Sequence, residues 1–387
     1  MRLIHLLGLS AAAAFACGGG HFQTFDDAGN PVDDGGNPIN GDASCPLCGV
    51  EGGSGGDGGG PFVCTPDPAN YDIPGNNCDD DGDGIVDNPQ GACDTGLPAN
   101  PSATQLAQAI GLCPNKGDTW GVVSAKFTQG YQNAKAPNAK QAGALPKFGT
   151  TVTPRQGSSI GIISSGFAAA EDCAGGNFNG SFNCAGTAAG TPPPGYPKSV
   201  NGCPVMSNIN NAMNVDLQIK VPNNAKGFSF DFNFYSGEWP DFVCTEYNDS
   251  FVAWLKSGAW AGKSGDFNIS FDSKNNPINV NNGFFQVCAP AGTDCSNMQS
   301  PATCTLGESQ LLGTGFDMKS DYCGSNETGG GATGWLTTTA PVQSGETIEL
   351  QFMVWNTGDD AYDSSVLLDN WQWQAGDQQV STVRPPN

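Results

Sequence analysis

Four carboxylates lie close together in the middle of the chain. No Lys or Arg separates them, and they are Glu238, Asp241, Glu246 and Asp249. A hard divalent cation that prefers oxygen ligands would relieve the repulsion among uncompensated acids, so this spacing predicts calcium binding. The alternative is a solvated acidic loop, and this segment alone leaves both interpretations open.

A second acidic group comes near the carboxyl terminus, at Asp359, Asp360, Asp363 and Asp369. Loops from distant strands gather at one edge of an antiparallel sandwich, so the two groups are predicted to share one site. A half-buried acid within a strand also requires a cation or backbone donors. We therefore expect calcium to be held by some of Glu238, Asp241, Asp249, Asp363 and Asp369. The alternative is that Asp363 and Asp369 cap turns.

An aspartate-rich loop precedes the strands. Its acids alternate and a glycine follows them, as in D-x-D-x-D-G calcium loops. The expected ligands are Asp79, Asp81, Asp83, the carbonyl of Ile85, and Asp87. Gln90 stands where an EF-hand has its bidentate Glu, and no flanking helices are evident. The loop instead resembles thrombospondin type 3 calcium repeats, and Cys78 and Cys93 are predicted to close it with a disulfide.

The histidine count excludes several chemistries. The only histidines are His5 and His21, both ahead of any folded region. A Ser-His-Asp triad, a Cys-His nucleophile or a His-based zinc site is therefore excluded from the folded part. A carboxylate-pair glycoside hydrolase would need acids such as Glu238 and Asp369, for which calcium would compete. We expect no catalytic residues and no enzymatic activity.

The amino-terminal residues 1–17 are typical of an export signal, with Arg2 followed by an apolar run that ends in small residues and Cys17. The approach to Cys17 is similar to a bacterial lipobox. The chain has 15 cysteines, so lipidation of Cys17 leaves an even number that can pair completely. We expect a lipid anchor at the outer membrane or cell surface. The alternative is cleavage after Ala16 and simple secretion.

The remaining organisation follows from composition. Residues 18–61 are rich in Gly and Asp and are predicted to form a disordered tether. Residues 62–95 hold the calcium loop, 96–375 a β domain, and 376–387 a tail. A net charge of −23 disfavours nucleic acid and anionic lipid as partners and favours cations, so membrane contact is expected only through Cys17.

Alternating apolar residues predict the strands, and one segment with a Ser102 cap, residues 102–113, predicts a helix. The predicted strands span residues 120–127, 159–167, 215–221, 228–235, 250–255, 266–271, 335–339, 347–355 and 366–373. Residues 129–157 are predicted to be a loop. The fold class is therefore all-β: an antiparallel sandwich or jelly roll with one short helix and disulfide-rich loops.

Tryptophans suggest a second kind of binding. Trp371 and Trp373 alternate with Gln372 and Gln374, so one face of the last predicted strand would be indole and the other amide. Such a platform is typical of carbohydrate contact, although tryptophans in sandwiches also fill cores.

The segment SGEWPDFVCTEYNDSFVAWL, residues 236–255, resembles the signature of the bacterial choice-of-anchor L domain. WNTGDDAYDSSVLLDNWQW, residues 355–373, is similar to the last two strands of that family, and the resemblance spans about residues 98–374. It implies an extracytoplasmic surface protein with a β-sandwich and no assigned reaction. The sequence thus predicts a calcium-stabilised surface lipoprotein that binds a surface glycan or a matrix or envelope protein. The alternatives are a carbohydrate-binding module or, less favoured, a glycoside hydrolase.

Overall fold

The computed structural model describes residues 64–90, 93–114, 119–169, 188–200, 202–281, 284–289, 304–317 and 329–386. It also describes two short antiparallel strands, β1 (Thr24–Phe25) and β2 (Pro31–Val32). The chain divides into two compact units, Met1–Val63 and Cys64–Asn387. The predicted export signal and Cys17 lie outside the described residues, as does the predicted tether except for β1 and β2.

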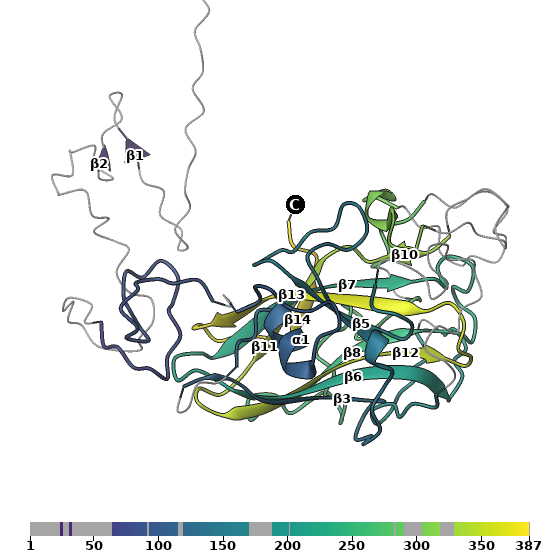
Figure 1. Ribbon diagram of the computed structural model, residues 1–387, viewed down its shortest axis with the longest axis horizontal. Helices are drawn as coiled ribbons and strands as arrows, with labels where there is room; N and C mark the ends of the chain where they lie inside the picture. The colour runs from purple at the N-terminus through teal and green to yellow at the C-terminus, as the bar shows by residue number, and fades with distance from the viewer. Residues whose placement is uncertain are drawn as a thin grey trace, which may run out of the picture. The chain divides into compact units, whose positions relative to one another are not determined.

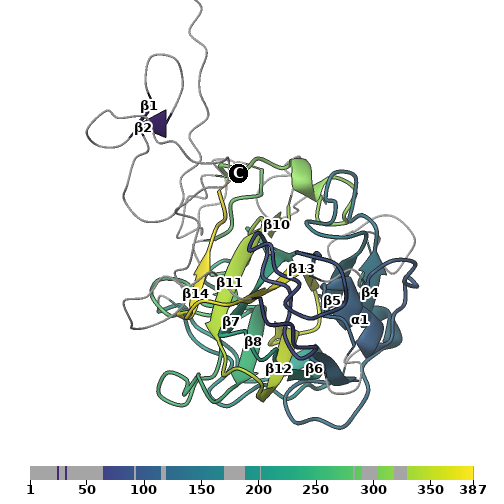
Figure 2. The same cartoon turned by 90° about the vertical axis from the view of Figure 1, so that its left-hand side faces the viewer.

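The second unit is an antiparallel β-sandwich, which confirms the predicted fold class. One sheet has the order β3-β6-β12-β8-β9, formed by Gly121–Thr128, Ile209–Lys220, Thr347–Thr357, Ser250–Lys256 and Ile278–Asn279. The other has the order β14-β11-β7-β13-β5-β4, formed by Ser381–Val383, Leu336–Pro341, Gly227–Ser236, Ser364–Gln374, Ile160–Ser164 and Ala142–Leu145. Strand β10 (Gly331–Ala332) also pairs with β7. Figures 1 and 2 show β7, β11 and β13 stacked over β6, β8 and β12.

The alternation read from the sequence builds the main core. Alternate residues of β7 point inward, and Phe228, Phe230, Phe232 and Phe234 are all fully buried. They meet the alternating Ile348, Leu350, Phe352 and Val354 of β12 across the sandwich. The ring centroids of Phe230 and Phe352 lie 4.9 Å apart, edge to face. Aromatic packing of this kind between two inner faces holds the sheets together.

The outer faces of both sheets are covered as well. Tyr235 and Leu367 belong to a second apolar cluster with Phe148, whereas Trp254 and Trp355 belong to a third with Tyr196. Loops therefore bury the outer faces, and this explains why β7, β8 and β12 are buried on both sides.

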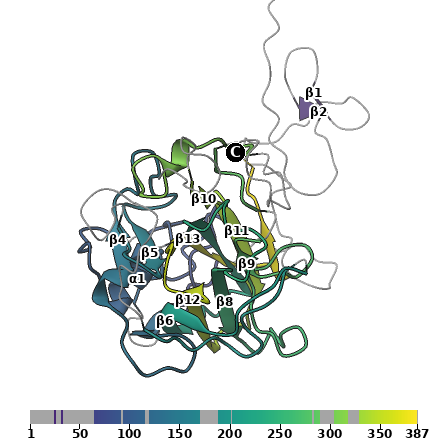
Figure 3. The same ribbon diagram turned by 90° about the vertical axis from the view of Figure 1, so that its right-hand side faces the viewer.

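One helix, α1 (Ala103–Ala109), closes the side of the sandwich next to β4 and β5 (Figure 3). Ser102 and Gln105 form a capping box, which confirms the predicted cap. The helix is shorter than predicted because Gly111 takes a φ of +97° and ends it. A Cβ on Gly161 of β5 would lie 2.8 Å from the Ile110 side chain, so glycine allows the helix to pack closely.

Two predicted segments differ in the structure. Residues 129–157 are not all loop, because they contain a 3₁₀ turn, η1 (Ala139–Gln141), and strand β4. Residues 266–271 make only isolated bridges instead of the predicted strand. The side chain of Asn268 accepts the backbone N–H of Ala253 at 3.1 Å and donates to the carbonyl of Ser270 at 2.8 Å. Backbone bonds still join this segment to β8, from the N–H of Leu255 to the carbonyl of Phe267 at 3.0 Å and from the N–H of Ile269 to the carbonyl of Ala253 at 2.8 Å. The Asn268 side chain therefore interrupts a regular ladder at one N–H of β8.

Four disulfides are seen in the part of the chain that the structure describes. They are Cys64–Cys78, Cys93–Cys113, Cys203–Cys244 and Cys288–Cys304. The predicted Cys78–Cys93 bridge is therefore wrong, although both cysteines are bonded. The carboxylate of Asp87 closes the loop instead, because it accepts the backbone N–H groups of Gly75 and Asn76 at 2.9 and 3.1 Å.

Candidate functional site

Three carboxylates converge in the segment ahead of the sandwich. Asp72, Asp79 and Asp81 each place one oxygen within 4.8 Å of the others. This is the geometry of oxygen ligands around a cation such as calcium. Asp79 and Asp81 belong to the predicted loop, whereas sequence reasoning missed Asp72, whose only signal is an acid just upstream of the Pro74–Gly75 turn.

The other predicted ligands of this loop have different partners. Asp83 accepts the backbone N–H of Ile85 and the side-chain amide of Asn88, each at 2.8 Å. Asp87 binds the backbone at residues 75–77. The side chain of Ile85 is exposed. The structure thus groups Asp79 and Asp81 with Asp72 and does not add Asp83 or Asp87 to that group.

Backbone donors hold Asp72 in place. Its Oδ1 accepts the N–H of Asp80 at 2.7 Å, and its Oδ2 accepts the N–H of Asn88 at 3.0 Å. Burial raises the pKa of Asp81, and the negative charges of Asp72, Asp83 and Asp79 raise it further. No ion pair among the described residues involves these acids. Within the described chain, backbone N–H groups are therefore the donors that offset the repulsion among these acids.

The acidic loop is tied to the sandwich. Gln90 Oε1 accepts the backbone N–H of Trp373 in β13 at 2.6 Å, and its carbonyl accepts from Gln156 Nε2 at 2.7 Å. Asp94 accepts the N–H of Ser159 at 2.9 Å, next to β5. A ligand that orders the acidic loop would therefore also stabilise β13 and β5, the two strands of the larger sheet that these hydrogen bonds reach.

A second acidic cluster occupies one edge of the sandwich, where β7 and β12 end and β8 and β13 begin. Its members are Glu238, Asp249 and Asp363, only 2, 0 and 3 % exposed. Glu238 Oε2 accepts the N–H of Asp249 at 3.2 Å. Asp249 in turn accepts from Ser364 Oγ at 2.7 Å, so it joins the start of β8 to the start of β13. The structure thus brings together acids from both predicted groups.

Three buried side-chain oxygens at this edge lack hydrogen-bond partners among the described residues, and one of them is Asn248 Oδ1. Asn356 Nδ2 donates to Asp363 Oδ1 at 3.4 Å, but Asp363 Oδ2 and Asn356 Oδ1 are buried with no hydrogen bond within the described chain. Orphaned buried oxygens are costly, and a cation or a proton would satisfy them. Gly166 makes room for Asp363, because a Cβ there would lie 2.0 Å from Asp363 Oδ2.

Burial dominates the electrostatics of this cluster. It raises the pKa of Glu238 and Asp249 well above the usual range for carboxyls, and the charge of Asp249 raises that of Glu238 further. Burial also raises the pKa of Asp363 to about 7. No ion pair among the described residues compensates these three acids. At neutral pH they must therefore share protons or bind a cation.

The other two predicted ligands are placed differently. Asp369 lies five residues beyond Ser364 along β13, about 17 Å away at the usual rise per residue. Its Oδ2 accepts the backbone N–H of Arg155 at 2.7 Å, and burial raises its pKa to about 7. Asp369 is therefore not part of the edge cluster, and the Glu238–Asp369 pair considered for glycoside hydrolysis does not face a common substrate. Asp241 is half-buried in the turns after Glu238.

The last strand does have an indole face and an amide face, but the indole face lies in the core, so the carbohydrate contact considered for Trp371 and Trp373 is wrong and the core alternative is confirmed. Trp371 and Trp373 are 1 and 3 % exposed and belong to the main core. The register of β13 shifts between Asp369 and Gln372, where Asn370 takes a φ of +53°. This bulge changes which residues face inward, and both indoles turn into the sandwich. Trp120, Trp260 and Trp335 are the half-buried tryptophans.

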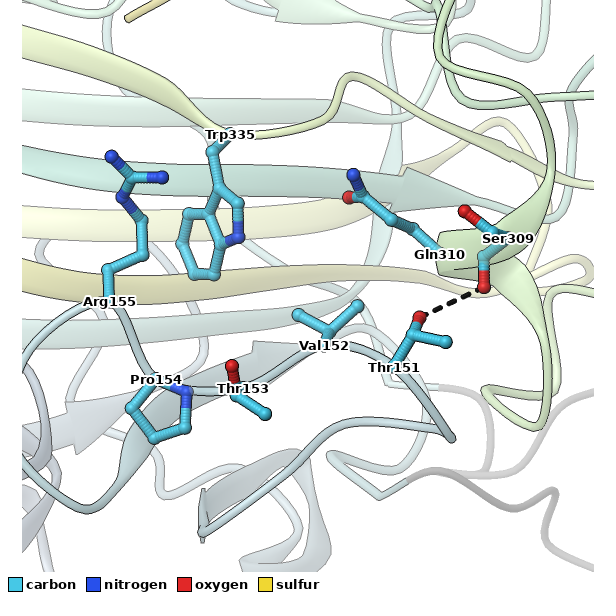
Figure 4. Close-up of a pocket in the computed structure, with 8 residues that line it drawn as sticks. All are labelled: Thr151, Val152, Thr153, Pro154, Arg155, Ser309, Gln310 and Trp335. Atoms are coloured by element: carbon cyan, nitrogen blue, oxygen red, sulfur yellow. Dashed lines mark hydrogen bonds between the residues drawn. The ribbon is translucent and has the colours of Figure 1, made fainter. Parts of the chain in front are cut away.

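Trp335 instead borders a pocket on the outer face of the larger sheet (Figure 4). Arg155 lies beside it and donates from Nε to the buried Asp231 at 2.5 Å. No alternating pattern in the sequence marked this pocket, because its wall residues come from loops.

The fold is a disulfide-braced β-sandwich with two acidic clusters. The family model of the choice-of-anchor L domain matches residues 129–373, well over half of the chain, so the chain belongs to that family. The family is one of surface-associated or exported proteins and is not an enzyme family. No curated protein and no solved structure matches the chain. Among the described residues no helix is long and apolar enough to span a membrane.

Proposed function

We propose that this chain is a non-enzymatic, calcium-stabilised surface lipoprotein that acts in adhesion or in envelope or matrix interaction. The observation that supports this best is the convergence of Asp72, Asp79 and Asp81 oxygens within 4.8 Å. Three carboxylates with no compensating cation offer calcium both charge and oxygen ligands. Backbone carbonyls and water would complete its six to eight ligands.

Calcium in this loop would act on the sandwich through existing contacts. The segment that carries the acids continues into Gln90 and Asp94, which bind the backbones of Trp373 and Ser159. A cation that orders the segment would therefore stabilise β13 and β5 as well. A ligand that binds only the folded state stabilises it by about 2.7 kcal/mol at a hundredfold excess over its Kd.

The edge cluster is a second proposed calcium site. Asp363 Oδ2 and Asn356 Oδ1 are unpartnered within the described chain and belong to side chains that contact each other, and Glu238 and Asp249 supply two further carboxyls at the same edge. Binding would require these acids to lose their protons, so affinity should rise with pH.

Attachment through Cys17 is the part of this proposal that rests on sequence alone, since that residue lies outside the described residues. The lipobox-like approach to Cys17 and the even number of remaining cysteines support it. Mass spectrometry of the mature protein tests it, because a lipidated amino-terminal cysteine and a free Cys17 differ by the mass of the acyl groups. A surface glycan or a matrix or envelope protein is the proposed partner.

Calorimetric unfolding of the full chain carrying Cys17→Ser, with EDTA or with calcium, tests the calcium proposal. We expect calcium to raise the Tm and magnesium to raise it less. Asp79→Asn and Asp81→Asn should reduce the calcium-dependent rise. Asp377→Asn removes one charge from an exposed acid paired with Lys226 and should leave the rise unchanged. An unchanged Tm with calcium for the unsubstituted loop would contradict the proposal.

A further inference from the structure

The Trp335 pocket is a concave site formed by residues that the structure describes. It has a volume of about 450 Å³ and is lined by residues 151–155, Ser309, Gln310 and Trp335. Figure 4 shows the Trp335 indole between the side chains of Arg155 and Gln310, with Val152 and Thr151 on the opposite wall. This volume falls within the range of small-ligand sites.

The walls of the pocket are fixed by hydrogen bonds. Thr151 Oγ1 donates to the carbonyl of Ser309 at 2.9 Å, which ties the two wall loops together. Asn233 Nδ2 donates to Gln310 Oε1 at 3.3 Å, and the Tyr235 hydroxyl donates to the Gln310 carbonyl at 3.3 Å. Both come from β7, so the sheet itself holds the Gln310 wall. A ligand would enter a site that needs little ordering.

The lining presents an aromatic side chain among unused hydrogen-bond donors. The Arg155 guanidinium carbon lies 5.9 Å from the centroid of the Trp335 ring. The Arg155 Nη groups, Gln310 Nε2 and the Thr153 hydroxyl make no hydrogen bond within the described chain, although Arg155 Nε and Gln310 Oε1 are both engaged. Directional donors beside an indole match the hydroxyl groups and apolar face of a sugar ring.

The charge of the pocket and of the whole chain favours neutral saccharides over anionic ones. Arg155 is the only charged residue of the lining, and Asp231, which is 1 % exposed, already compensates it at 2.5 Å. Asp231 is held there by Thr337 Oγ1 at 2.5 Å and Asn370 Nδ2 at 2.9 Å. The pocket is thus close to neutral, and the chain as a whole carries −23, which opposes the approach of anions.

We propose that this pocket binds a neutral saccharide, with one sugar ring against Trp335 and its hydroxyls bound by Arg155, Gln310 and Thr153. The site deepens the proposed function, because it names the class of ligand through which a surface protein would adhere. The saccharide site rests on one part of the proposed function, namely that the protein is exposed on the outside of the cell. It does not depend on calcium.

Isothermal titration of the full chain carrying Cys17→Ser tests the proposal. The probes are neutral hexasaccharides of β-1,4-glucose, α-1,4-glucose, xylose, mannose and N-acetylglucosamine, with a hexamer of galacturonic acid as the anionic arm. We expect at least one neutral oligosaccharide to bind and the anionic one not to bind. Trp335→Ala should weaken binding about tenfold or more, the loss expected for one aromatic contact.

Two variants make the result specific. Trp335→Phe keeps an aromatic ring and should bind within a few fold of the unsubstituted protein. Trp260→Ala removes a half-buried indole elsewhere and should bind as tightly as the unsubstituted protein. Near-ultraviolet circular dichroism shows that each variant is folded.

Three results would overturn the proposal: no neutral probe binds, only the anionic probe binds, or folded Trp335→Ala binds unchanged. Asp79→Asn, which impairs the calcium loop, should leave saccharide binding intact. Failure of the calcium proposal and failure of the saccharide proposal are therefore distinguishable.

Discussion

Oε2 of Glu238 accepts the backbone N–H of Asp249 at 3.2 Å, although 11 residues separate them in the chain. Both carboxyls are buried, burial raises the pKa of each well above its usual range, and the charge of Asp249 raises the pKa of Glu238 further. The bond joins the chain leaving β7 to the start of β8, so it crosses from one sheet to the other. The edge of the sandwich is thereby closed by groups whose charge state depends on pH and on cations.

The calcium-free protein should be less stable at pH 8 than at pH 5. Burial raises the pKa of Asp363 from 3.8 to about 7, so between these values the folded state binds more protons than the unfolded state. Its contribution to stability is complete below about pH 4 and is lost as pH rises through about 7. Urea unfolding in EDTA at a series of pH values measures this trend.

Asp363→Asn provides the control for that trend, because an amide of similar shape does not titrate. The variant should lose less stability than the unsubstituted protein between pH 5 and pH 8. Asp377→Asn, at an exposed position, should keep the full dependence. Equal slopes for Asp363→Asn and the unsubstituted protein would show that Asp363 does not titrate in this range.

Gly166→Ala should destabilise the domain by about 1–3 kcal/mol, the usual cost of overpacking. A methyl group at this position would lie 2.0 Å from Asp363 Oδ2, and that carboxyl is buried with little room to move. Gly376→Ala is the matched control, since its Cβ would meet nothing closer than 3.8 Å. Chemical denaturation measures both, and a tolerated Gly166→Ala would mean that Asp363 can swing away.

Gln90→Ala should lower stability by about 1–3 kcal/mol, because it leaves the N–H of Trp373 buried without its acceptor. It should also reduce the rise in Tm on adding calcium, since Gln90 links the acidic loop to β13. Gln379→Ala, at an exposed position after β13, should do neither. If Gln90→Ala lowers the Tm but keeps the full calcium effect, the loop stabilises the sandwich by another route.

Arg155→Leu should cost about 3 kcal/mol or more, because it leaves the buried Asp231 carboxylate without its cation. The side chains of this pair are 35 and 2 % exposed. Lys126→Leu breaks the pair with Asp216, in which the lysine is 67 % exposed, and should cost under about 1 kcal/mol. Thermal unfolding of the two variants compares a buried with an exposed ion pair, and equal losses would contradict the expected difference.

Sequence periodicity predicted what depends on local patterns. The alternation in β7 and β12 gave their inner faces, and the spacing of strands and turns gave the fold class. Prediction from periodicity failed where a tertiary contact determines strand pairing or which side chains face inward. The Asn268 side chain takes the N–H of Ala253 and interrupts a regular ladder, and the bulge at Asn370 turns Trp371 and Trp373 into the core. An alternating sequence pattern indicates neither the side-chain hydrogen bond nor the bulge.

The acidic residues also divide into those that sequence spacing places together and those that only the fold brings together. The sequence brought Asp79 next to Asp81 because they are two positions apart, but Asp72 joins them only after the chain turns back at Pro74. The convergence of Glu238, Asp249 and Asp363 follows from antiparallel pairing, which places starts and ends of strands at one edge. Asp369 lies mid-strand on β13, so the same pairing carries it away from that edge.

Strand β3 ends at Thr128, one residue before the region that matches the family. It pairs with β6 along most of that strand, and α1 lies further upstream with Leu106 and Ile110 in the core. A protein cut to the matched region would expose the backbone of β6 to pairing between molecules. The segment that the family model matches is thus shorter than the sheet it belongs to, and a protein trimmed to that segment should self-associate through the uncovered edge of β6.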